Sequence, residues 1–354
     1  MKKEHTIKDI AKALGVSIGT VDRALNNRGR ISKETRKKVL EMADKIGYKP
    51  NRIARTLVLQ RNIRIAAILP TIPEYFFGKI EDGIKNAARE LKDFGIEVVY
   101  YYSKAVNEFL PQIELFKNVI QTKYDGILII PTNANLLKPY VDAAVEALTP
   151  VVTLNNDVPQ SKRLCFVGED SIKAGKTAAE LMGKFLNNEG KVAILSGFLQ
   201  ATALKRRYEG FEEVIHQNYP GIELIGPYEY SEDMCEAYEI TKELLLKNID
   251  LKGIFLTSTT GLVPAANAIL DSKREKFVKI IGFDINEQIQ VMMREDIIYS
   301  TIYQDPYAQG YYSLRILSKY IIDGLEPQQE YLYTKSEILL KENSNNEAYP
   351  LYMY

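Results

Sequence analysis

The chain has 354 residues, of which 46% are hydrophobic and 26% are charged. This length exceeds that of one typical domain and favours two or three domains with the composition of a globular protein. The chain has no apolar run of the ~18 residues that a membrane span needs, and basic residues at its N-terminus are followed by no apolar segment of a secretory signal. We therefore expect a cytoplasmic protein that spans no membrane.

The two cysteines exclude two further classes of protein. Cys165 and Cys235 lie far apart in the sequence, and no pattern of other ligand residues accompanies either of them. A disulfide framework needs several paired cysteines, and a structural zinc site needs closely spaced ligands. We expect no metal site.

Positive charge is concentrated at the N-terminus. Residues 1–61 contain 16 Lys and Arg against 6 Asp and Glu, a net charge of +10. Residues 62–354 contain 30 against 40, a net charge of −10. A basic head on an acidic body is typical of a protein whose head contacts a polyanion.

The basic head has the pattern of a helix-turn-helix. Thr6 begins a capping-box-like stretch, and apolar residues at helical spacing then predict a helix over 7–14. Gly15 can end that helix with a positive φ, and Ser17 is a favourable N-cap for a second helix. A third helix with a basic outer face is predicted from near Ser32. Two short helices joined by a turn containing Gly form the helix-turn-helix unit.

Three stretches of the head carry a likeness to a known family: TIKDIAKALGVSIGTVDRALN, RGRISKETRKKVLEMADKIGYKPN and RIARTL. Together they resemble the N-terminal domain of the LacI/GalR family of bacterial transcription regulators. The resemblance implies that the second helix enters the major groove of a double-stranded DNA operator. It also implies that residues 51–61 form a hinge helix in the minor groove.

The resemblance also assigns roles to single residues of the head. It places Ile18, Gly19 and Arg23 at base-facing positions, and Leu57 at an apolar wedge that unstacks a base step and bends the duplex. The other DNA-contact candidates are expected to meet phosphates or the minor groove: Ser17, Thr20, Asn26, Arg28, Arg30, Asn51 and Arg52. Thr6 and Ala54 complete the predicted DNA-binding set.

After residue 62, apolar strands alternate with amphipathic helices. The predicted strands are RIAAILP, IEVVYYY, DGILIIP, PVVTLNN, KVAILSG, LKGIFLTS and VKIIGFD. This alternation indicates parallel sheets covered by helices on both faces, and the number of strands favours two α/β subdomains. No nucleotide-binding, P-loop or nucleophile-elbow motif occurs, so we expect no catalytic residue, no cofactor and no enzyme.

Ligands of open α/β sheets bind beyond the carboxyl ends of the strands. Here those ends carry aromatic, amide and carboxylate side chains, among them Phe76, Phe77, Asn155, Asp284 and Gln304. Aromatic faces stack on the C–H surface of a sugar ring, and amides and carboxylates bind its hydroxyls. The pattern fits a small polyhydroxylated ligand.

The body, roughly residues 63–340, is similar to the periplasmic sugar-binding proteins of the ribose-binding type I class, through FFGKIEDG, VGEDSIKAGKTAAELM, KRRYEGF, IGFD and TIYQDP. The similarity implies a two-subdomain effector-binding fold behind an all-α helix-turn-helix domain. It matches Phe76 and Phe77 to aromatic residues that stack on the sugar, and Glu74 to a polar ligand position. Lys205 falls at a position that clamps the sugar, with Arg207 nearby. Asp284 and Gln304 match an acidic and an amide ligand.

Two pairs of residues depart from the pattern of that class. Asn155 and Asn156 stand where an Asp-Arg pair is familiar, and Ser258 and Thr259 replace an Asn-Asp pair. The predicted effector-binding set comprises Glu74, Phe76, Phe77, Asn155, Asn156, Lys205, Arg207, Ser258, Asp284 and Gln304.

The predicted domain organisation has four parts. They are a DNA-binding domain at 1–50, a hinge helix or linker at 51–61, an effector domain at 62–340 and a tail at 341–354. Within the effector domain, an N-subdomain is expected at about 62–167 and 300–328, and a C-subdomain at about 168–299 and 329–340. The chain is expected to cross between them near residues 168, 300 and 330.

These features predict a DNA-binding transcriptional regulator, expected to be a repressor, whose operator affinity is controlled allosterically by a sugar or polyol. A purine or nucleobase corepressor is the alternative ligand. A cytoplasmic sugar-binding or sugar-processing protein is a further alternative, which the basic head disfavours. A homodimer on a near-palindromic operator is expected. The tail has no leucine heptads, so nothing there supports a tetramer.

Overall fold

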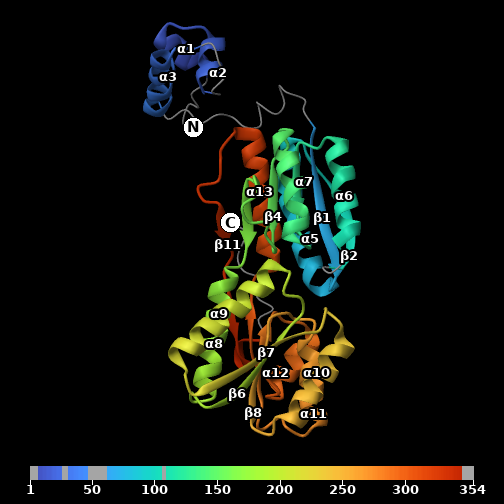
Figure 1. Cartoon of the computed structure of the whole chain (residues 1–354). Helices are drawn as coiled ribbons and strands as arrows, with labels where there is room; N and C mark the ends of the chain where they lie inside the picture. Colours follow the sequence, from blue (N-terminus) through green and yellow to red (C-terminus); the bar gives the residue numbers. More distant parts are fainter. Residues whose placement is uncertain (1–6, 26–30, 47–61, 106–108, 345–354) are drawn as a thin grey trace. The chain divides into compact units, whose positions relative to one another are not determined.

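A computed structural model describes residues 7–25, 31–46, 62–105 and 109–344. These residues form a helical head and an α/β body, which are separate units (Figure 1). The predicted hinge helix at 51–61 and the last ten residues of the predicted tail lie outside the described residues.

The head consists of the three predicted helices, α1 (Ile7–Leu14), α2 (Ile18–Leu25) and α3 (Lys33–Lys45). Gly15 has a φ of +65° and turns the chain between the first two helices. The Ser17 and Ser32 side chains cap α2 and α3 by accepting hydrogen bonds from backbone N–H groups three residues on. The inward faces of the three helices form one small core of Ile10, Ala11, Val21, Ala24, Val39 and Ala43.

The described body contains two six-stranded sheets, each the centre of one lobe. In the first lobe all neighbouring strands are parallel, in the order β11-β5-β4-β3-β1-β2. Its strands are β1 (Ile63–Ile72), β2 (Ile96–Ala105), β3 (Gly126–Ile129), β4 (Val151–Leu154), β5 (Cys165–Gly168) and β11 (Tyr331–Tyr333).

The second lobe repeats this order as β12-β10-β9-β8-β6-β7, with only β12 antiparallel to its neighbour. Its strands are β6 (Gly190–Ser196), β7 (Ile222–Glu229), β8 (Leu251–Leu256), β9 (Lys279–Phe283), β10 (Ile298–Tyr303) and β12 (Glu337–Leu339). The five strands other than β12 are parallel because a helix connects each of them to the next, as the alternation of patterns predicts.

Helices cover both faces of each sheet (Figure 1). The helices of the first lobe are α5 (Glu74–Glu90), α6 (Phe109–Thr122), α7 (Ala134–Glu146) and α13 (Pro306–Asp323). Those of the second lobe are α8 (Ser171–Phe185), α9 (Thr202–Asn218), α10 (Met234–Lys247), α11 (Leu262–Asp271) and α12 (Glu287–Arg294). Two short 3-10 helices, η1 (Lys92–Phe94) and η2 (Lys341–Asn343), complete the described elements. None of the described helices has the length and apolar character of a membrane span.

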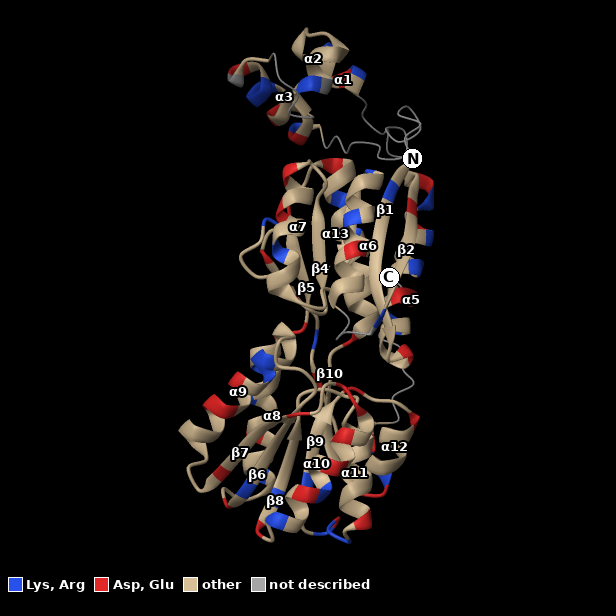
Figure 2. Cartoon of the chain, turned by 45° about the vertical axis from the view of Figure 1, so that its right-hand side comes forward, with Lys and Arg blue, Asp and Glu red and all other residues tan. Residues whose placement is uncertain are grey.

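Three segments of the chain cross between the lobes (Figure 2). They follow β5, β10 and β11, and Thr334 in the third segment ties them together. Its backbone N–H donates to the Gly168 carbonyl at 2.7 Å, and its hydroxyl donates to the Gln304 carbonyl at 3.0 Å. Because β10 pairs with β9 of the second lobe, the crossing expected at 300 lies after Tyr303. Because β11 pairs with β5 of the first lobe, the crossing expected at 329 lies after Tyr333.

The seven strands predicted from apolar runs are confirmed as β1, β2, β3, β4, β6, β8 and β9. The apolar runs did not identify β5, β7, β10, β11 or β12. Of these, β7 is an edge strand whose sequence IELIGPYE contains a Gly-Pro pair and has only one buried residue. Such a strand lacks the continuous apolar run of a central parallel strand.

The packing of α5 against α13 predicts opposite effects of one substitution at two glycines of α5. A Cβ on Gly83 would collide with the backbone of Tyr307 and Tyr311 in α13, whereas a Cβ on Gly78 would meet only open space. Gly83→Ala is expected to lower the free energy of unfolding by about 1–3 kcal/mol. Gly78→Ala, the matched control, should raise it by about 0.5–1 kcal/mol through helix propensity. Urea denaturation of both variants measures this, and equal effects would contradict the close helix contact.

Candidate functional site

The described part of the head presents α2 with an exposed outer face. Ile18 is 48% exposed, and Gly19 and Arg23 are also exposed. The Arg23 Nε donates to the Gly19 carbonyl at 3.0 Å, so the guanidinium lies along the first turn of the helix. The Ser17 and Thr20 hydroxyls hydrogen-bond to each other at 2.8 Å beside the same turn. The structure thus brings five of the predicted DNA-contact residues together at one end of α2.

The remaining candidates for DNA contact lie outside the described residues: Thr6, Asn26, Arg28, Arg30, Asn51, Arg52, Ala54 and Leu57. Their roles stay predictions. In α3, the exposed Lys37 and Lys38 each lie near a glutamate four residues away, at 3.9 Å and 2.8 Å. Such exposed pairs contribute little to stability, so both lysines are available to an outside partner.

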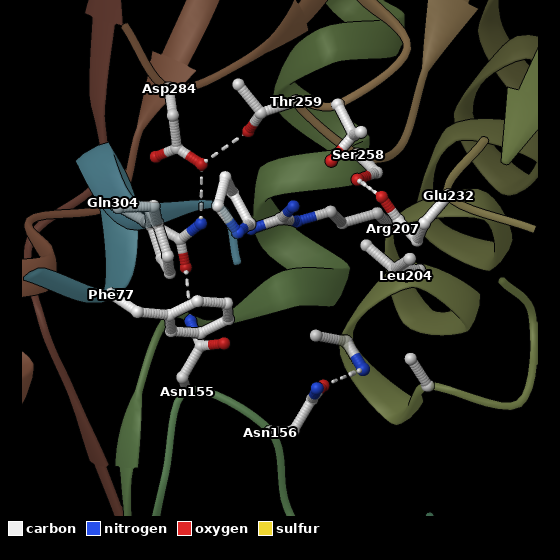
Figure 3. A pocket seen from close by; sticks show the side chains of 15 residues that line it. Phe77, Asn155, Asn156, Leu204, Arg207, Glu232, Ser258, Thr259, Asp284 and Gln304 are labelled. Atoms are coloured by element: carbon white, nitrogen blue, oxygen red, sulfur yellow. Dashed lines mark hydrogen bonds between the residues drawn. The ribbon is translucent and has the colours of Figure 1, made fainter. Parts of the chain in front are cut away.

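The body contains a pocket at the carboxyl ends of the strands. Figure 3 shows the side chains that line it. Eight residues of the predicted effector set lie there: Phe76, Phe77, Asn155, Asn156, Arg207, Ser258, Asp284 and Gln304. They come from the start of α5, from α9, and from the segments that follow β4, β8, β9 and β10. Both lobes therefore contribute to one site, as the strand-end rule predicts.

Asp284 is the centre of a buried polar network in the pocket (Figure 3). Its Oδ2 accepts hydrogen bonds from the Thr259 hydroxyl and the Gln304 amide, both at 2.9 Å. Its Oδ1 has no partner among the described residues. Burial raises the pKa of this carboxyl above its ordinary value, and the nearby Arg207 opposes that effect. The site thus contains a buried acceptor oxygen that a ligand can use.

Two asparagines connect the first lobe to this network and to the second lobe. The Asn155 Nδ2 donates to the side-chain oxygens of Gln304 and Gln309, both at 3.2 Å. The Asn156 Oδ1 accepts from the backbone N–H of Ala203, at the start of α9, at 3.2 Å. The loop after β4 is therefore held against both the crossing segment and the second lobe.

Arg207 lies in the pocket wall and is fixed on three sides. Its guanidinium pairs with the buried Glu169 carboxylate at 2.7 Å, donates to the Thr257 carbonyl at 2.8 Å and lies 3.6 Å from the centre of the Phe283 ring. Burial raises the pKa of Glu169, and the arginine opposes that effect. The ion pair and the stacked ring hold the guanidinium in one orientation.

Two residues of the predicted effector set do not line the pocket. The Lys205 side chain is 62% exposed and lies 3.8 Å from Glu209 on the outer face of α9. Arg207, two residues on, points into the pocket instead because successive helical positions are about 100° apart. Glu74 begins α5 and is exposed, while Pro73 and the two phenylalanines form that part of the wall.

Sequence reasoning missed Glu232 and Tyr75. Glu232 lines the pocket after β7, accepts from the Ser258 hydroxyl at 3.0 Å, and has its pKa raised by burial. Recognising β7 would have placed this acid at a strand end. The hydroxyl of Tyr75, in the first lobe, interacts with Thr259 and Asn286 of the second, and burial raises its pKa. No pattern in the sequence marks Tyr75 as different from its aromatic neighbours.

Comparison with protein families assigns both parts of the chain. Residues 6–51 match the model described as bacterial regulatory proteins, lacI family, and residues 65–325 match the model described as periplasmic binding protein domain. The chain is a LacI-family transcriptional regulator. Its effector domain has the fold of the periplasmic binding proteins, so the expected fold class is confirmed.

The regulator is similar to whole proteins of the same organisation. It is 26% identical to the HTH-type transcriptional regulator pepR1 of Lactobacillus delbrueckii subsp. lactis, over 98% of this chain and 99% of that protein. It is 27% identical to a ribose operon repressor of Halalkalibacterium halodurans, over 89% of this chain and 90% of that protein. Both likenesses extend across the head and the body.

Solved structures match the body of the regulator. A solute-binding protein of Agrobacterium vitis with bound D-fucose is 26% identical, with a TM-score of 0.75 over 80% of this chain and 97% of that chain. A solute-binding protein of Burkholderia graminis in complex with D-arabinose is 25% identical, with a TM-score of 0.75 over 81% of this chain and 98% of that chain. The effector domain is thus sugar-binding-like in structure.

Two of the basic residues of α9, Lys205 and Arg207, predict a contrast in stability. Arg207→Met is expected to lower the free energy of unfolding by about 3–5 kcal/mol, because it leaves the buried Glu169 carboxylate without its partner. Lys205→Met makes the same change at an exposed position and should cost no more than about 1 kcal/mol. Chemical denaturation of the two variants makes the comparison. Similar losses in both would contradict the buried ion pair.

Proposed function

We propose that this regulator binds a near-palindromic operator as a repressor, and that a sugar or polyol in the pocket controls its operator affinity. One observation carries the ligand part of the proposal: Phe77 and a chain of amide and carboxylate groups from both lobes face a single pocket. Two structural relatives of the body hold D-arabinose and D-fucose, which supports a carbohydrate ligand.

The position of the pocket supports allosteric control. The Asn156 contact to α9 and a hydrogen bond from the Thr202 hydroxyl to the Asp157 carbonyl at 3.3 Å both join the lobes beside the pocket. A ligand that contacts both lobes favours the arrangement of the lobes in which these contacts are made. It changes operator affinity only to the extent that it binds this arrangement of the lobes more tightly than another arrangement.

The exposed end of α2 supports a specific mode of DNA contact. Ile18 suits the methyl group of thymine, Arg23 suits guanine, and Gly19 leaves room for the DNA backbone or a base edge. Ser17 and Thr20 suit phosphates, which position the protein without reading sequence. Leu57 and its neighbours in 51–61 are proposed as the hinge contacts.

We infer a homodimer because a helix-turn-helix head reads one half-site, and two heads match a near-palindrome. Light scattering of the full chain should give the mass of two chains, and a monomer mass would contradict this inference. A regulator of DNA acts in the cytoplasm and needs no catalysis.

A ligand screen tests the proposed function directly. Sugars, amino sugars, polyols, sugar phosphates and purines are added in turn to the full chain, and thermal unfolding is followed. A carbohydrate hit should raise the unfolding temperature and change the operator affinity by about fivefold or more. Hits confined to purines would replace the sugar with a nucleobase corepressor. The absence of any hit would contradict the pocket as an effector site.

The DNA-binding surface predicts that Arg23 contributes to sequence specificity, whereas Arg36 contributes to affinity for any duplex. Arg23→Ala should cost about 1–3 kcal/mol on an operator selected from random duplexes and relax its sequence preference. Arg36→Ala removes the same charge from the exposed face of α3 and should weaken specific and non-specific duplexes alike. Gel-shift titrations on both kinds of duplex measure this. An equal loss of specificity in both variants would contradict base reading by α2.

A further inference from the structure

The pocket contains more carboxyl groups than basic groups. Its lining residues, all of which the structure describes, include three with charged groups: Arg207, Glu232 and Asp284. Arg207 is already paired with a third carboxylate, that of Glu169, at 2.7 Å. The other two carboxylates have no cation of their own within the lining. A charged carboxylate that is buried, as in Asp284, or half-buried, as in Glu232, costs free energy unless it is paired, so the pocket favours a cationic group on a ligand.

The buried oxygen of Asp284 shows that the site is incomplete without a ligand. The residue is only 3% exposed, and its Oδ2 accepts two hydrogen bonds while its Oδ1 accepts none from the described residues. An unpaired buried acceptor costs free energy that a donor on a ligand recovers. This oxygen therefore points to a ligand that donates hydrogen bonds.

Glu232 offers a second acceptor group with a different shape. Its Oε2 accepts from the Ser258 hydroxyl at 3.0 Å, and the side chain of Thr260 also hydrogen-bonds to it. One carboxylate and two hydroxyl oxygens thus gather at one part of the wall. Three acceptor oxygens match the three N–H donors of an ammonium group, and the hydroxyls keep free lone pairs after donating. Figure 3 shows Glu232 and Asp284 on different sides of the pocket.

We propose that the effector is an amino sugar, whose ammonium group pairs with Glu232 and whose ring hydroxyls donate to Asp284. This inference rests on the proposed function and specifies the ligand class of the same pocket. Phe77 supplies the apolar face that packs on the sugar ring, and Asn155 and Asn156 lie beside it.

The same charge balance disfavours acidic ligands. A sugar phosphate or a uronic acid would bring further negative charge next to two carboxylates at low effective dielectric constant. Arg207 offsets part of this repulsion, but its guanidinium is already paired with the Glu169 carboxylate at 2.7 Å. A neutral sugar satisfies the hydrogen bonds but leaves Glu232 without a countercharge.

Isothermal titration of the full chain at neutral pH compares matched ligands. Glucosamine and galactosamine are each compared with three ligands: the parent sugar, the N-acetyl derivative and the 6-phosphate of the parent sugar. The N-acetyl derivative keeps the nitrogen substituent but removes its charge. At least one amine should bind about tenfold or more tighter than its parent and its N-acetyl form. The sugar phosphates should bind most weakly.

Two variants locate the preference. Glu232→Gln keeps the size of the side chain and should reduce the preference for the amine to about twofold or less. Glu239→Gln, on the exposed face of α10, should leave the preference unchanged. Thermal unfolding checks that both variants fold. If Glu232→Gln does not fold, the comparison of amine with N-acetyl sugar on the natural chain decides.

The outcomes separate this inference from the proposed function. If neutral sugars bind as tightly as amines and change operator affinity, the inference fails while the proposed function stands. If the amine preference survives Glu232→Gln, the assigned contact is wrong. If neither amine binds, the inference is overturned, and if no carbohydrate binds at all, the proposed sugar response fails with it.

Discussion

The hydrogen-bonded chain from Asn155 through Gln304 to Asp284 is the interaction on which the geometry of the effector domain depends. It joins the end of β4 in the first lobe to the ends of β10 and β9 in the second. Thr334 fastens the same crossing region by two further hydrogen bonds. Because two lobes of repeated strand order meet only at their carboxyl ends, this chain fixes how those ends face each other. The pocket, its polar lining and the contacts between the lobes all follow from that placement.

The residues of this chain also sit in unusual backbone conformations. Asn155, Asp284 and the neighbouring Asp305 have φ values of 62°, 59° and 55°. Asn and Asp tolerate the left-handed region better than most residues, and such strain persists only where the surroundings hold it in place. Here it turns the chain sharply after each strand and brings the side chains of Asn155 and Asp284 into the pocket. Together with the buried Asp284 Oδ1, which accepts no hydrogen bond from the described residues, it marks a site where stability is given up for ligand binding.

Much of this arrangement follows from the sequence, and the exceptions have physical causes. The caps at Ser17 and Ser32 located the head helices, and apolar runs located the central strands whose ends carry Asn155 and Asp284. The edge strand β7 has no such run, so the acid that follows it, Glu232, was not recognised. Lys205 and Arg207 were both predicted by their place in the family pattern, whereas the rotation of α9 brings Arg207 into the pocket and leaves Lys205 exposed. The crossing points depend on β-pairing between distant segments, which periodicity does not reveal.

In the proposed mechanism, ligand binding in the body and operator binding by the head are coupled. Thermodynamic linkage requires this coupling to be reciprocal. The factor by which the ligand changes operator affinity therefore equals the factor by which the operator changes ligand affinity. The direct measurement is titration of the carbohydrate ligand into the regulator alone and into the regulator saturated with operator. The two ligand affinities should differ by the same factor, about fivefold or more, by which the ligand changes operator affinity. Equal ligand affinities in the two titrations would contradict it.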